Sequence, residues 1–569
     1  MSTETIDQAA PEPPPPSGDG GGADDSPDFT VVGTGVAVVL AVVAWAAFGK
    51  DSFDRASGTA LTWVLDNFAW LFVVAADLFL VLCLVLSVSR FGRIRLGRDD
   101  DEPEFTTLAW IAMMFSAGMG IGLMFYGVGE PLTHYLNPPP SAGVQPRTGG
   151  AALVAMEYSF FHWTLTPWAI YGIAGLALAY AGFRKGRGNR LSAVFVPLMG
   201  ERRAAGWPGR IIDLLAVFAT VFGTATSLGV GTLQVATGLR LTTGVTASTT
   251  LQLIIIAALS AAFVASAFSG LHKGVKWLST ANLVLAACLM LFVFVLGPTV
   301  YILDVIPASV GGYLHELLPM ASRTGAFTDR SWLGAWTIFY WAWWLSWAPF
   351  VGTFIARISR GRLVREFLIG VLLVPSGATV VWFCVMGGTG IRLDATGRVD
   401  MSAKVSEGAE ASLFAMLDAL PLGTITSWVA MILVMLYFIT SADSASLVMG
   451  SLTSRGALHP RTWLVVTWGV LMAAVAAVLL VAGGLESLQS ATILVALPFV
   501  VVMLALCWAL LKELREDPGA GPARGQALHG LRDAVRTMVG DALTERSPES
   551  GRHQRLHRQA AKSRDQKDG

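Results

Sequence analysis

The sequence predicts an all-α polytopic membrane protein with twelve transmembrane helices, and three observations support this fold class. Hydrophobic residues make up 54% of the 569 residues and charged residues only 14%, with a mean hydropathy of +0.58. A soluble domain usually contains about 25% charged residues. Apolar stretches of about 20 residues, the length that crosses the hydrocarbon core, recur along the whole chain. The third observation is a regular alternation of charge between the loops.

Twelve apolar stretches can be counted, and we expect each of them to span the membrane. They lie near residues 30–48, 68–88, 106–130, 151–182, 212–238, 251–269, 277–303, 333–357, 363–388, 424–450, 462–482 and 490–511. Lys and Arg collect in the even-numbered loops, as expected for cytoplasmic loops. These residues include Arg90, Arg93, Arg95, Arg98, Arg184, Lys185, Arg187, Arg190, Arg202, Arg203, Lys273, Lys276, Arg357, Arg360, Arg362, Arg365, Arg455 and Arg461. The alternation predicts a multi-pass protein with both termini in the cytoplasm.

The two ends of the chain differ from the apolar region between them. Residues 1–29 are acidic and rich in Pro and Gly, and they lack the basic and apolar regions of a signal peptide. We expect a disordered cytoplasmic tail there, followed by a twelve-helix membrane domain at 30–511. Residues 512–569 are expected to form a second cytoplasmic tail, partly helical and with a basic end that could bind anionic lipid. A solvated tail that only orients the last span is an equal alternative.

Glycine recurs in the third predicted span, "FSAGMGIGLMFYGVGEPL". Gly118, Gly120 and Gly122 alternate along this stretch, and Gly118 with Gly122 also fits a helix-packing contact. Closely spaced glycines weaken a helix, however, and an unwound turn exposes backbone groups that can face a substrate or a cation at mid-membrane. The sequence therefore predicts a broken third span, with close packing as the alternative.

Tryptophan is concentrated in the eighth predicted span, "FYWAWWLSWAPF" at 339–350. At about 100° per residue, Trp343 and Trp347 share one narrow sector and Trp344 lies about 80° to one side. Trp341 points away from this stripe, so we expect it to serve packing. Pro349 removes a backbone donor, and we expect the helix to break there.

A second aromatic group lies in the fourth predicted span, "FHWTLTPWAIYG". It contains Trp163, Trp168 and Tyr171, with Pro167 among them. Aromatic faces at the membrane centre suit a quaternary ammonium, which has no N–H to donate and is held by cation–π attraction. A purely structural aromatic cluster is the alternative.

Hydroxyl side chains recur in the fifth and tenth predicted spans. Thr220 and Thr224 are one helical turn apart, and "YFITSADSAS" contains Thr440 and Ser441. Hydroxyls and freed carbonyls are hard oxygen ligands of the kind that sodium prefers. The alternative is that these side chains bond to their own helix.

Few charged residues fall inside the predicted spans, and no enzyme motif accompanies them. The acids are Asp77, Glu130, Glu157, Asp213 and Asp443, which are expected near span ends or in internal pairs. No nucleophile, phosphate-binding loop or metal-hydrolase pattern is found. We therefore expect no enzymatic activity, no cofactor and no nucleic-acid partner.

Four of these stretches together resemble the betaine/choline/carnitine transporter family. They are "AGMGIGLMFYGVGEPL", "TVFGTATSLGVGTLQ", "FYWAWWLSWAPFVGTFIARISRGRLVREF" and "TSADSAS". The resemblance covers about residues 30–510 and implies a LeuT-type fold, in which spans 3–7 and 8–12 form inverted repeats of five. It also implies a homotrimer in a prokaryotic plasma membrane.

The resemblance further implies roles for individual residues. The aromatic substrate box would consist of Trp163, Trp168, Tyr171, Trp343, Trp344 and Trp347. One sodium site would use Thr220, Thr224 and Phe350. A second would use Ser116, Met119, Tyr437, Thr440 and Ser441. Sodium is the only metal expected.

Gly122 separates the subtypes that the family implies. Proton-coupled choline carriers similar to this chain have Asp at this position, so Gly122 favours sodium symport of a quaternary-ammonium solute. Glycine betaine is the expected substrate, for osmoprotection. The alternatives are choline, carnitine, ectoine or dimethylsulfoniopropionate with other ion coupling, or a channel or membrane sensor.

Overall fold

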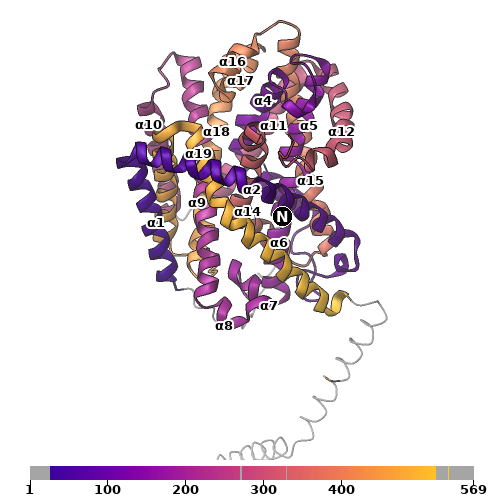
Figure 1. Cartoon of the computed structure of the whole chain (residues 1–569), viewed down its shortest axis with the longest axis vertical. Coiled ribbons are helices and arrows are strands. Elements are labelled where there is room, and N and C mark those ends of the chain that lie inside the picture. The colour runs from indigo at the N-terminus through magenta and orange to yellow at the C-terminus, as the bar shows by residue number, and fades with distance from the viewer. Residues whose placement is uncertain (1–25, 119, 270–271, 328–329, 521–535, 537–569) are drawn as a thin grey trace, which may run out of the picture.

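Helices make up nearly all of the part of the chain that the computed structural model describes, namely residues 26–118, 120–269, 272–327, 330–520 and 536 (Figure 1). No strand occurs within these ranges, and the one isolated β-bridge joins Arg95 to Leu363. The all-α fold class is therefore confirmed. Most of the two predicted tails lies outside the described residues, so the predictions for the tails stay predictions.

Nine helical segments within these ranges are long and apolar enough to cross a membrane. They are α1 (Phe29–Phe48), α2 (Lys50–Val88), Gly149–Arg184, α9 (Trp207–Thr243), α10 (Thr249–Ser269), α11 (His272–Leu296), α15 (Val364–Ala395), α18 (Gly423–Thr453) and α19 (Thr462–Glu516). The last helix, α19, is kinked at Gly483 and Gly484 and contains the last two predicted spans. The third and eighth predicted spans fall on shorter helices. The count of twelve therefore remains a prediction.

The remaining helices are short or lie in connections. They are α3 (Thr107–Gly118), α4 (Ile121–Leu136), α7 (Val196–Met199), α8 (Glu201–Ala204), α12 (Thr299–Ala321), α13 (Arg330–Leu333), α14 (Phe339–Arg357), α16 (Met401–Glu407) and α17 (Ala409–Asp418), with single turns at Arg90–Arg93, Pro140–Ala142, Leu191–Phe195 and Pro518–Ala520.

The third predicted span is broken where its glycines cluster. Helix α3 ends at Gly118 and α4 begins at Ile121, with Gly120 between them in an extended conformation at φ −158° and ψ −174°. The predicted interruption is confirmed. The helix breaks here because closely spaced glycines lower its stability.

The fourth predicted span also breaks, although no break was predicted there. Helix α5 (Gly149–Trp163) is followed by α6 (Leu165–Ala179) and by a π-helical turn at Tyr180–Arg184. Thr164 between the two helices has φ −112° and ψ −113°. Pro167 has no N–H to donate to the carbonyl of Trp163, so the hydrogen-bond pattern restarts at this point.

The predicted break at Pro349 is wrong. Helix α14 continues through Pro349 to Arg357, and only the segment before it, Gly334–Ile338, departs from α-helical bonding by forming a π-helix. Proline removes a single hydrogen bond, which is tolerated inside a membrane protein where neighbouring helices support the backbone. Here α14 packs closely on α6 and α9.

Helices α14 and α6 approach each other closely at two glycines. A Cβ atom on Gly352 would lie 2.8 Å from Cβ of Ala174 and 3.1 Å from the backbone nitrogen of Gly175. A Cβ atom on Gly175 would lie 2.5 Å from Ile355. The backbones of the two helices that contain the aromatic residues therefore touch.

The positively charged loops at 90–98, 184–203 and 357–365 lie at one end of the molecule, the end that bears α7 and α8 (Figure 1). The loop after α2 and the loop after α14 exchange backbone hydrogen bonds, from Leu96 N to the Arg362 carbonyl and from Gly361 N to the Leu96 carbonyl. Arg184 reaches both Asp99 and Asp517. The grouping agrees with the predicted alternation of the loops.

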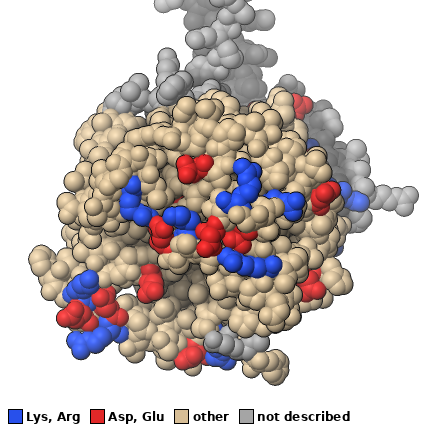
Figure 2. Space-filling model, turned by 90° about the horizontal axis from the view of Figure 1, so that it is seen from above, with Lys and Arg blue, Asp and Glu red and all other residues tan. Residues whose placement is uncertain are grey.

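The opposite end bears α16 and α17, and it carries charges of both signs. Figure 2 shows Lys and Arg interspersed with Asp and Glu on this face, without a large patch of one sign. Arg147 pairs with Asp394 and Asp400, and Arg240 pairs with Glu407. This end therefore offers no extended field of one sign.

Replacing Gly352 with valine is expected to destabilise the protein. The new side chain would collide with the backbone of α6, and overpacking of this kind typically costs about 1–3 kcal/mol. Thermal unfolding of the purified protein in detergent measures the effect as a lower midpoint. Gly33→Val is the matched control, because nothing lies within 4 Å of a Cβ atom at Gly33 on α1. Equal midpoints for the two variants would contradict the close contact.

Asp517 joins the end of α19 to the π-helical turn Tyr180–Arg184 that follows α6, and its contribution depends on pH. Its carboxylate accepts hydrogen bonds from Tyr180 Oη at 2.6 Å, Arg184 Nε at 3.0 Å and the amide of Gly519 at 2.7 Å. Burial raises the pKa of Asp517, but these hydrogen bonds outweigh burial and hold the pKa below its ordinary value. The contact is thus fully present above the ordinary carboxyl pKa and is lost as pH falls through the lowered value.

We expect the chain around Asp517 to become more accessible at acidic pH, and Asp517→Asn to have this effect already at neutral pH. Hydrogen exchange of residues 513–520 measures the change. Asp418→Asn at the end of α17 is the control, because Asp418 lies at the opposite end of the molecule. Exchange that is the same in the wild type and in Asp517→Asn would refute the role of this carboxylate.

Candidate substrate box and cation sites

The six aromatic residues predicted to form a substrate box surround one cavity. Its empty volume is about 540 Å³. The cavity lies between α5, α6 and α14 and the start of α4, and its lining includes Trp163, Trp168, Tyr171, Trp343, Trp344 and Trp347. The structure therefore brings together two groups of residues that lie far apart in the sequence.

The rings present faces and edges to one another in a fixed arrangement. Trp343 and Trp344 are stacked with ring centroids 5.0 Å apart and planes 10° apart. Trp163 meets Trp344 edge-on at 4.9 Å, and Tyr171 meets it at 6.3 Å. Such contacts between aromatic rings restrict rotation of the side chains. The cavity is therefore lined by rings that hold each other in place.

The start of α4, next to the break, also lines the cavity. Gly120, Ile121 and Gly122 line it. A Cβ atom on Gly122 would lie 2.7 Å from the ring of Trp163 and 3.1 Å from that of Trp343. Glycine is thus required at 122 for these two indoles to sit where they do. Gly118, the third predicted glycine, lies outside the residues whose side chains are described.

Most of the box indoles donate their N–H groups to acceptors outside the cavity. Trp343 Nε1 donates to the carbonyl of Gly223 at 3.2 Å, and Trp344 Nε1 to the carbonyl of His162 at 2.9 Å. The N–H of Trp347 finds no acceptor among the described residues. Trp341 is fully buried against Phe161 and does not line the cavity, so the prediction that it serves packing is confirmed.

A second cavity adjoins the first, and half of its lining residues carry a hydroxyl or amide group. Its empty volume is about 770 Å³, and it shares Gly120, Trp347 and Val351 with the aromatic cavity. Its other lining residues are Ser279, Asn282, Leu283, Phe350, Phe354, Tyr437, Thr440, Ser441 and Ser444. Three of the residues predicted for the second sodium site, Tyr437, Thr440 and Ser441, therefore face one space.

The oxygen atoms of this cavity differ in how far they are already engaged. The hydroxyl of Tyr437 is buried without a hydrogen-bond partner among the described residues. The hydroxyl of Thr440 accepts from Asn282 Nδ2 at 3.1 Å and donates to its own helix, while Asn282 Oδ1 has no such partner. Buried oxygens of this kind are available to a cation. Ser116 and Met119, the other predicted ligands, lie outside the residues whose side chains are described.

The first predicted sodium set is not gathered around one cavity. Phe350 lines the second cavity, whereas Thr220 and Thr224 are buried on α9. Thr220 donates to the carbonyl of Ala216, which is the bonding to its own helix that the sequence left open. Thr224 has a buried hydroxyl without a partner among the described residues, so it keeps a free oxygen.

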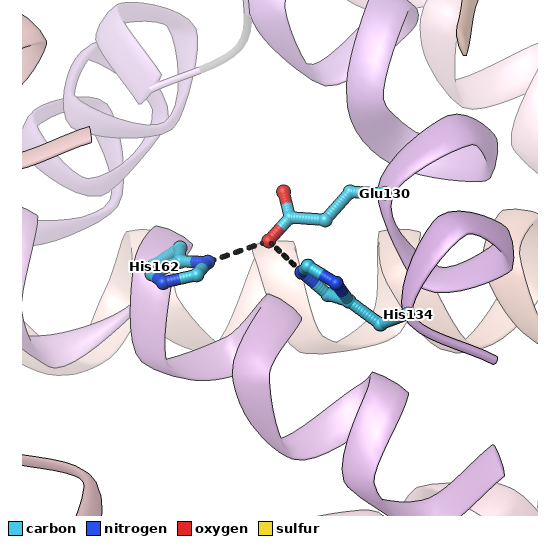
Figure 3. Close-up of side chains that lie close together, drawn as sticks. All are labelled: Glu130, His134 and His162. Carbon is cyan, nitrogen blue, oxygen red and sulfur yellow. Dashed lines mark hydrogen bonds and ion pairs between the residues drawn. The ribbon is translucent and has the colours of Figure 1, made fainter. Parts of the chain in front are cut away.

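A buried polar cluster next to the box was not assigned from the sequence. Glu130 on α4 lies between His134 on the same helix and His162 on α5, and all three are 0% exposed (Figure 3). Glu130 Oε1 is 2.7 Å from His162 Nδ1 and 3.5 Å from His134 Nε2. The signal in the sequence was the four-residue spacing of Glu130 and His134, which places them on one helix face.

By ligand type, these three residues could hold a metal ion, since their ligand atoms lie within 4.8 Å of one another. Their hydrogen bonds argue for a different use. Glu130 Oε2 accepts from Trp163 Nε1 at 2.7 Å and from Tyr340 Oη at 2.5 Å, and His162 Nε2 is 3.0 Å from the hydroxyl of Thr337. The cluster is thus tied into the wall of the aromatic cavity.

Comparison with known proteins agrees with this architecture. Residues 30–519 match the family model described as BCCT, betaine/carnitine/choline family transporter. The chain belongs to this transporter family. It is 45% identical over 484 residues to the glycine betaine transporter OpuD of Bacillus subtilis, covering 85% of this chain and 93% of the relative. It is 42% identical over 499 residues to the betaine/ectoine transporter LcoP of Corynebacterium glutamicum, covering 87% and 79%.

A third relative is similar over a comparable length. The transporter is 41% identical over 483 residues to a glycine betaine transporter of Acinetobacter baylyi, which covers 85% of this chain and 72% of the relative. The resemblance noted in the sequence is therefore confirmed, and the protein is a bacterial multi-pass membrane transporter rather than an enzyme. Membership of this family argues against the alternative of a channel or membrane sensor.

Proposed function

We propose that this transporter imports a quaternary-ammonium compatible solute, with glycine betaine as the preferred substrate, by symport with sodium, and that it serves osmoprotection. The observation that carries the proposal is the single cavity surrounded by Trp163, Trp168, Tyr171, Trp343, Trp344 and Trp347. A trimethylammonium group cannot donate a hydrogen bond, so ring faces in a desolvated cavity are its best partners. The printed names of the relatives point to the same substrate class.

Sodium coupling is supported by the second cavity. Tyr437, Thr440 and Ser441 supply neutral oxygen atoms there, and Thr224 supplies another on α9. Neutral ligands let a cation enter without a permanent charge in the membrane. Each sodium ion that moves inward gains about 2.3 kcal/mol per 100 mV of membrane potential, so two ions would support steep accumulation of a neutral zwitterion.

The proposal includes the orientation and assembly of the molecule. The positively charged end that bears α7 and α8 is placed in the cytoplasm, by the positive-inside rule. Both termini are then cytoplasmic, and the basic end of the C-terminal tail meets the anionic leaflet. We also propose a homotrimer, by analogy with the family.

Ectoine is the second candidate substrate, because one relative is a betaine/ectoine transporter by its printed name. Ectoine is a zwitterion whose cationic part carries N–H groups. The unpartnered oxygens near Trp347 could accept from such a group, whereas the ring faces alone favour a methylated cation.

Uptake of labelled solutes into proteoliposomes tests the function. We expect saturable uptake of glycine betaine under an inward sodium gradient, and no accumulation when sodium is replaced by potassium. Choline, carnitine, ectoine and dimethylsulfoniopropionate are measured in the same assay.

Thr224→Ala should raise the sodium concentration needed for half-maximal uptake by about tenfold, because it removes a buried oxygen ligand. Thr243→Ala, at the exposed end of the same helix, is the control. Uptake indifferent to sodium would refute symport.

Replacing Trp347 with leucine should weaken the binding of glycine betaine. A lost cation–π contact in a desolvated site corresponds to about threefold to thirtyfold in affinity. Equilibrium binding to the purified protein measures the change. Trp508→Leu is the matched control, because this indole on α19 is 70% exposed and lies away from the cavity. An unchanged affinity in Trp347→Leu would mean that the rings are packing only.

A further inference from the structure

Glu130 is a charged residue at a fully buried position, and nothing in the predicted sites uses it. It lies on α4 and has 0% exposure. Burying an isolated carboxylate in an apolar interior costs free energy. A buried carboxylate is therefore found where hydrogen bonds offset this cost and where its charge serves a function. The donors around it identify that use.

One donor to Glu130, Trp163, lines the aromatic cavity, and a second, Tyr340, contacts both His162 and rings that line the cavity. Trp163 Nε1 and Tyr340 Oη both donate to Oε2, at 2.7 and 2.5 Å, and His162 lies against Oε1 at 2.7 Å. An indole N–H can only donate. Oε2 thus accepts two hydrogen bonds, and Oε1 accepts a third where His162 carries a proton on Nδ1. With that tautomer the carboxyl group is ionised, and its negative charge lies directly behind Trp163.

The carboxylate also acts on Trp343 and Trp344, which it does not contact directly, through Tyr340 and His162. The ring of Tyr340 is stacked on Trp344, with centroids 5.8 Å apart and planes 16° apart, and on Trp343, with centroids 6.3 Å apart. His162 supplies the carbonyl to which Trp344 donates. Holding Tyr340 and His162 therefore also holds the stacked pair.

The same contacts connect three helices. Glu130 lies on α4, His162 and Trp163 on α5, and Tyr340 on α14. Their side chains meet at one carboxylate, so the relative positions of these helices are fixed where the box is built. Loss of this group would loosen the cavity wall in several places at once.

We propose that Glu130 is a positioning residue of the substrate box that also makes the box selective for a cationic head. The inference rests on the proposed function. Charge-assisted hydrogen bonds are about twice as strong as neutral ones, which fixes Trp163 and Tyr340. Donation to an anion also increases the electron density of the rings, and the charge itself attracts a cation across the low-dielectric wall. A tert-butyl group of the same shape gains nothing from either effect.

The test compares glycine betaine, whose head group is cationic, with an isostere whose head group is uncharged. Purified protein is titrated with glycine betaine and, by competition, with 3,3-dimethylbutanoate, in which carbon replaces the ammonium nitrogen. Glu130→Gln keeps the shape and an acceptor oxygen for Trp163 and Tyr340 but removes the charge. We expect it to weaken binding of glycine betaine by about tenfold and binding of the isostere by about twofold or less. A purely structural role would weaken both equally, and that result would overturn the proposal.

Two further variants serve as a matched control and as a second test of the hydrogen bonds to Glu130. Glu157→Gln is the matched control: Glu157 is buried on the same helix as Trp163, but its carboxylate lies against Gly312 of α12. It should leave both affinities unchanged. Tyr340→Phe keeps the ring and the charge of Glu130 but removes one donor, and it should weaken both ligands by about threefold. If Glu130→Gln does not fold, unchanged affinities in Tyr340→Phe overturn the proposal.

The remaining outcomes are also decisive. If the wild type binds glycine betaine and Glu130→Gln binds it equally well, this inference fails while the proposed function stands. If the wild type binds no quaternary ammonium, the proposed function fails and the inference fails with it. Elemental analysis of the wild type for zinc and manganese completes the test. About one ion per chain that is lost in His134→Ala would make the cluster a metal site and would overturn the role proposed here.

Discussion

The membrane interior offers a peptide group no water to bond with, and this constraint decides where the helices of this transporter can break. Non-helical backbone at membrane depth is tolerated only where it lines a cavity or is buried in protein. The interruption at Gly120 lies at the aromatic cavity, and the one at Thr164 follows directly after Trp163 of its wall. Pro349 lies between packed helices instead, and there α14 stays continuous. The breaks and the site are thus one feature of the structure.

The same constraint applies to the polar atoms of the side chains. An indole placed at the centre of a membrane for its face still has an N–H to satisfy. The structure meets this need with the carbonyls of Gly223 and His162 and with the carboxylate of Glu130. The first of these lies on α9, while the other two lie on α5 and α4, so the orientation of each ring depends on a neighbouring helix.

Much of this arrangement could be predicted from the sequence, because it rests on local signals. Glycine spacing predicted the gap after α3, and the helical stripe of tryptophans separated Trp341 from the residues that line the cavity. Pro167 and Pro349 carry the same local signal, yet only the first is associated with a break. The difference depends on tertiary packing, such as the contact of Gly352 with α6. The cluster around Glu130 was missed for the same reason, because His162 and Tyr340 join it only in the fold.

The position of Trp347 between the two cavities links substrate and cation in the proposed function. Its ring lines both spaces, and its N–H has no acceptor among the described residues. Because this ring lines both cavities, filling either cavity changes its surroundings. Coupling between two binding sites is reciprocal by thermodynamic necessity. Glu130 fixes the rings on the far side of the box, next to Trp163 and Tyr340. With that side held, Trp347 is a box indole that lines both cavities and whose buried N–H group can take a new partner when either cavity is filled.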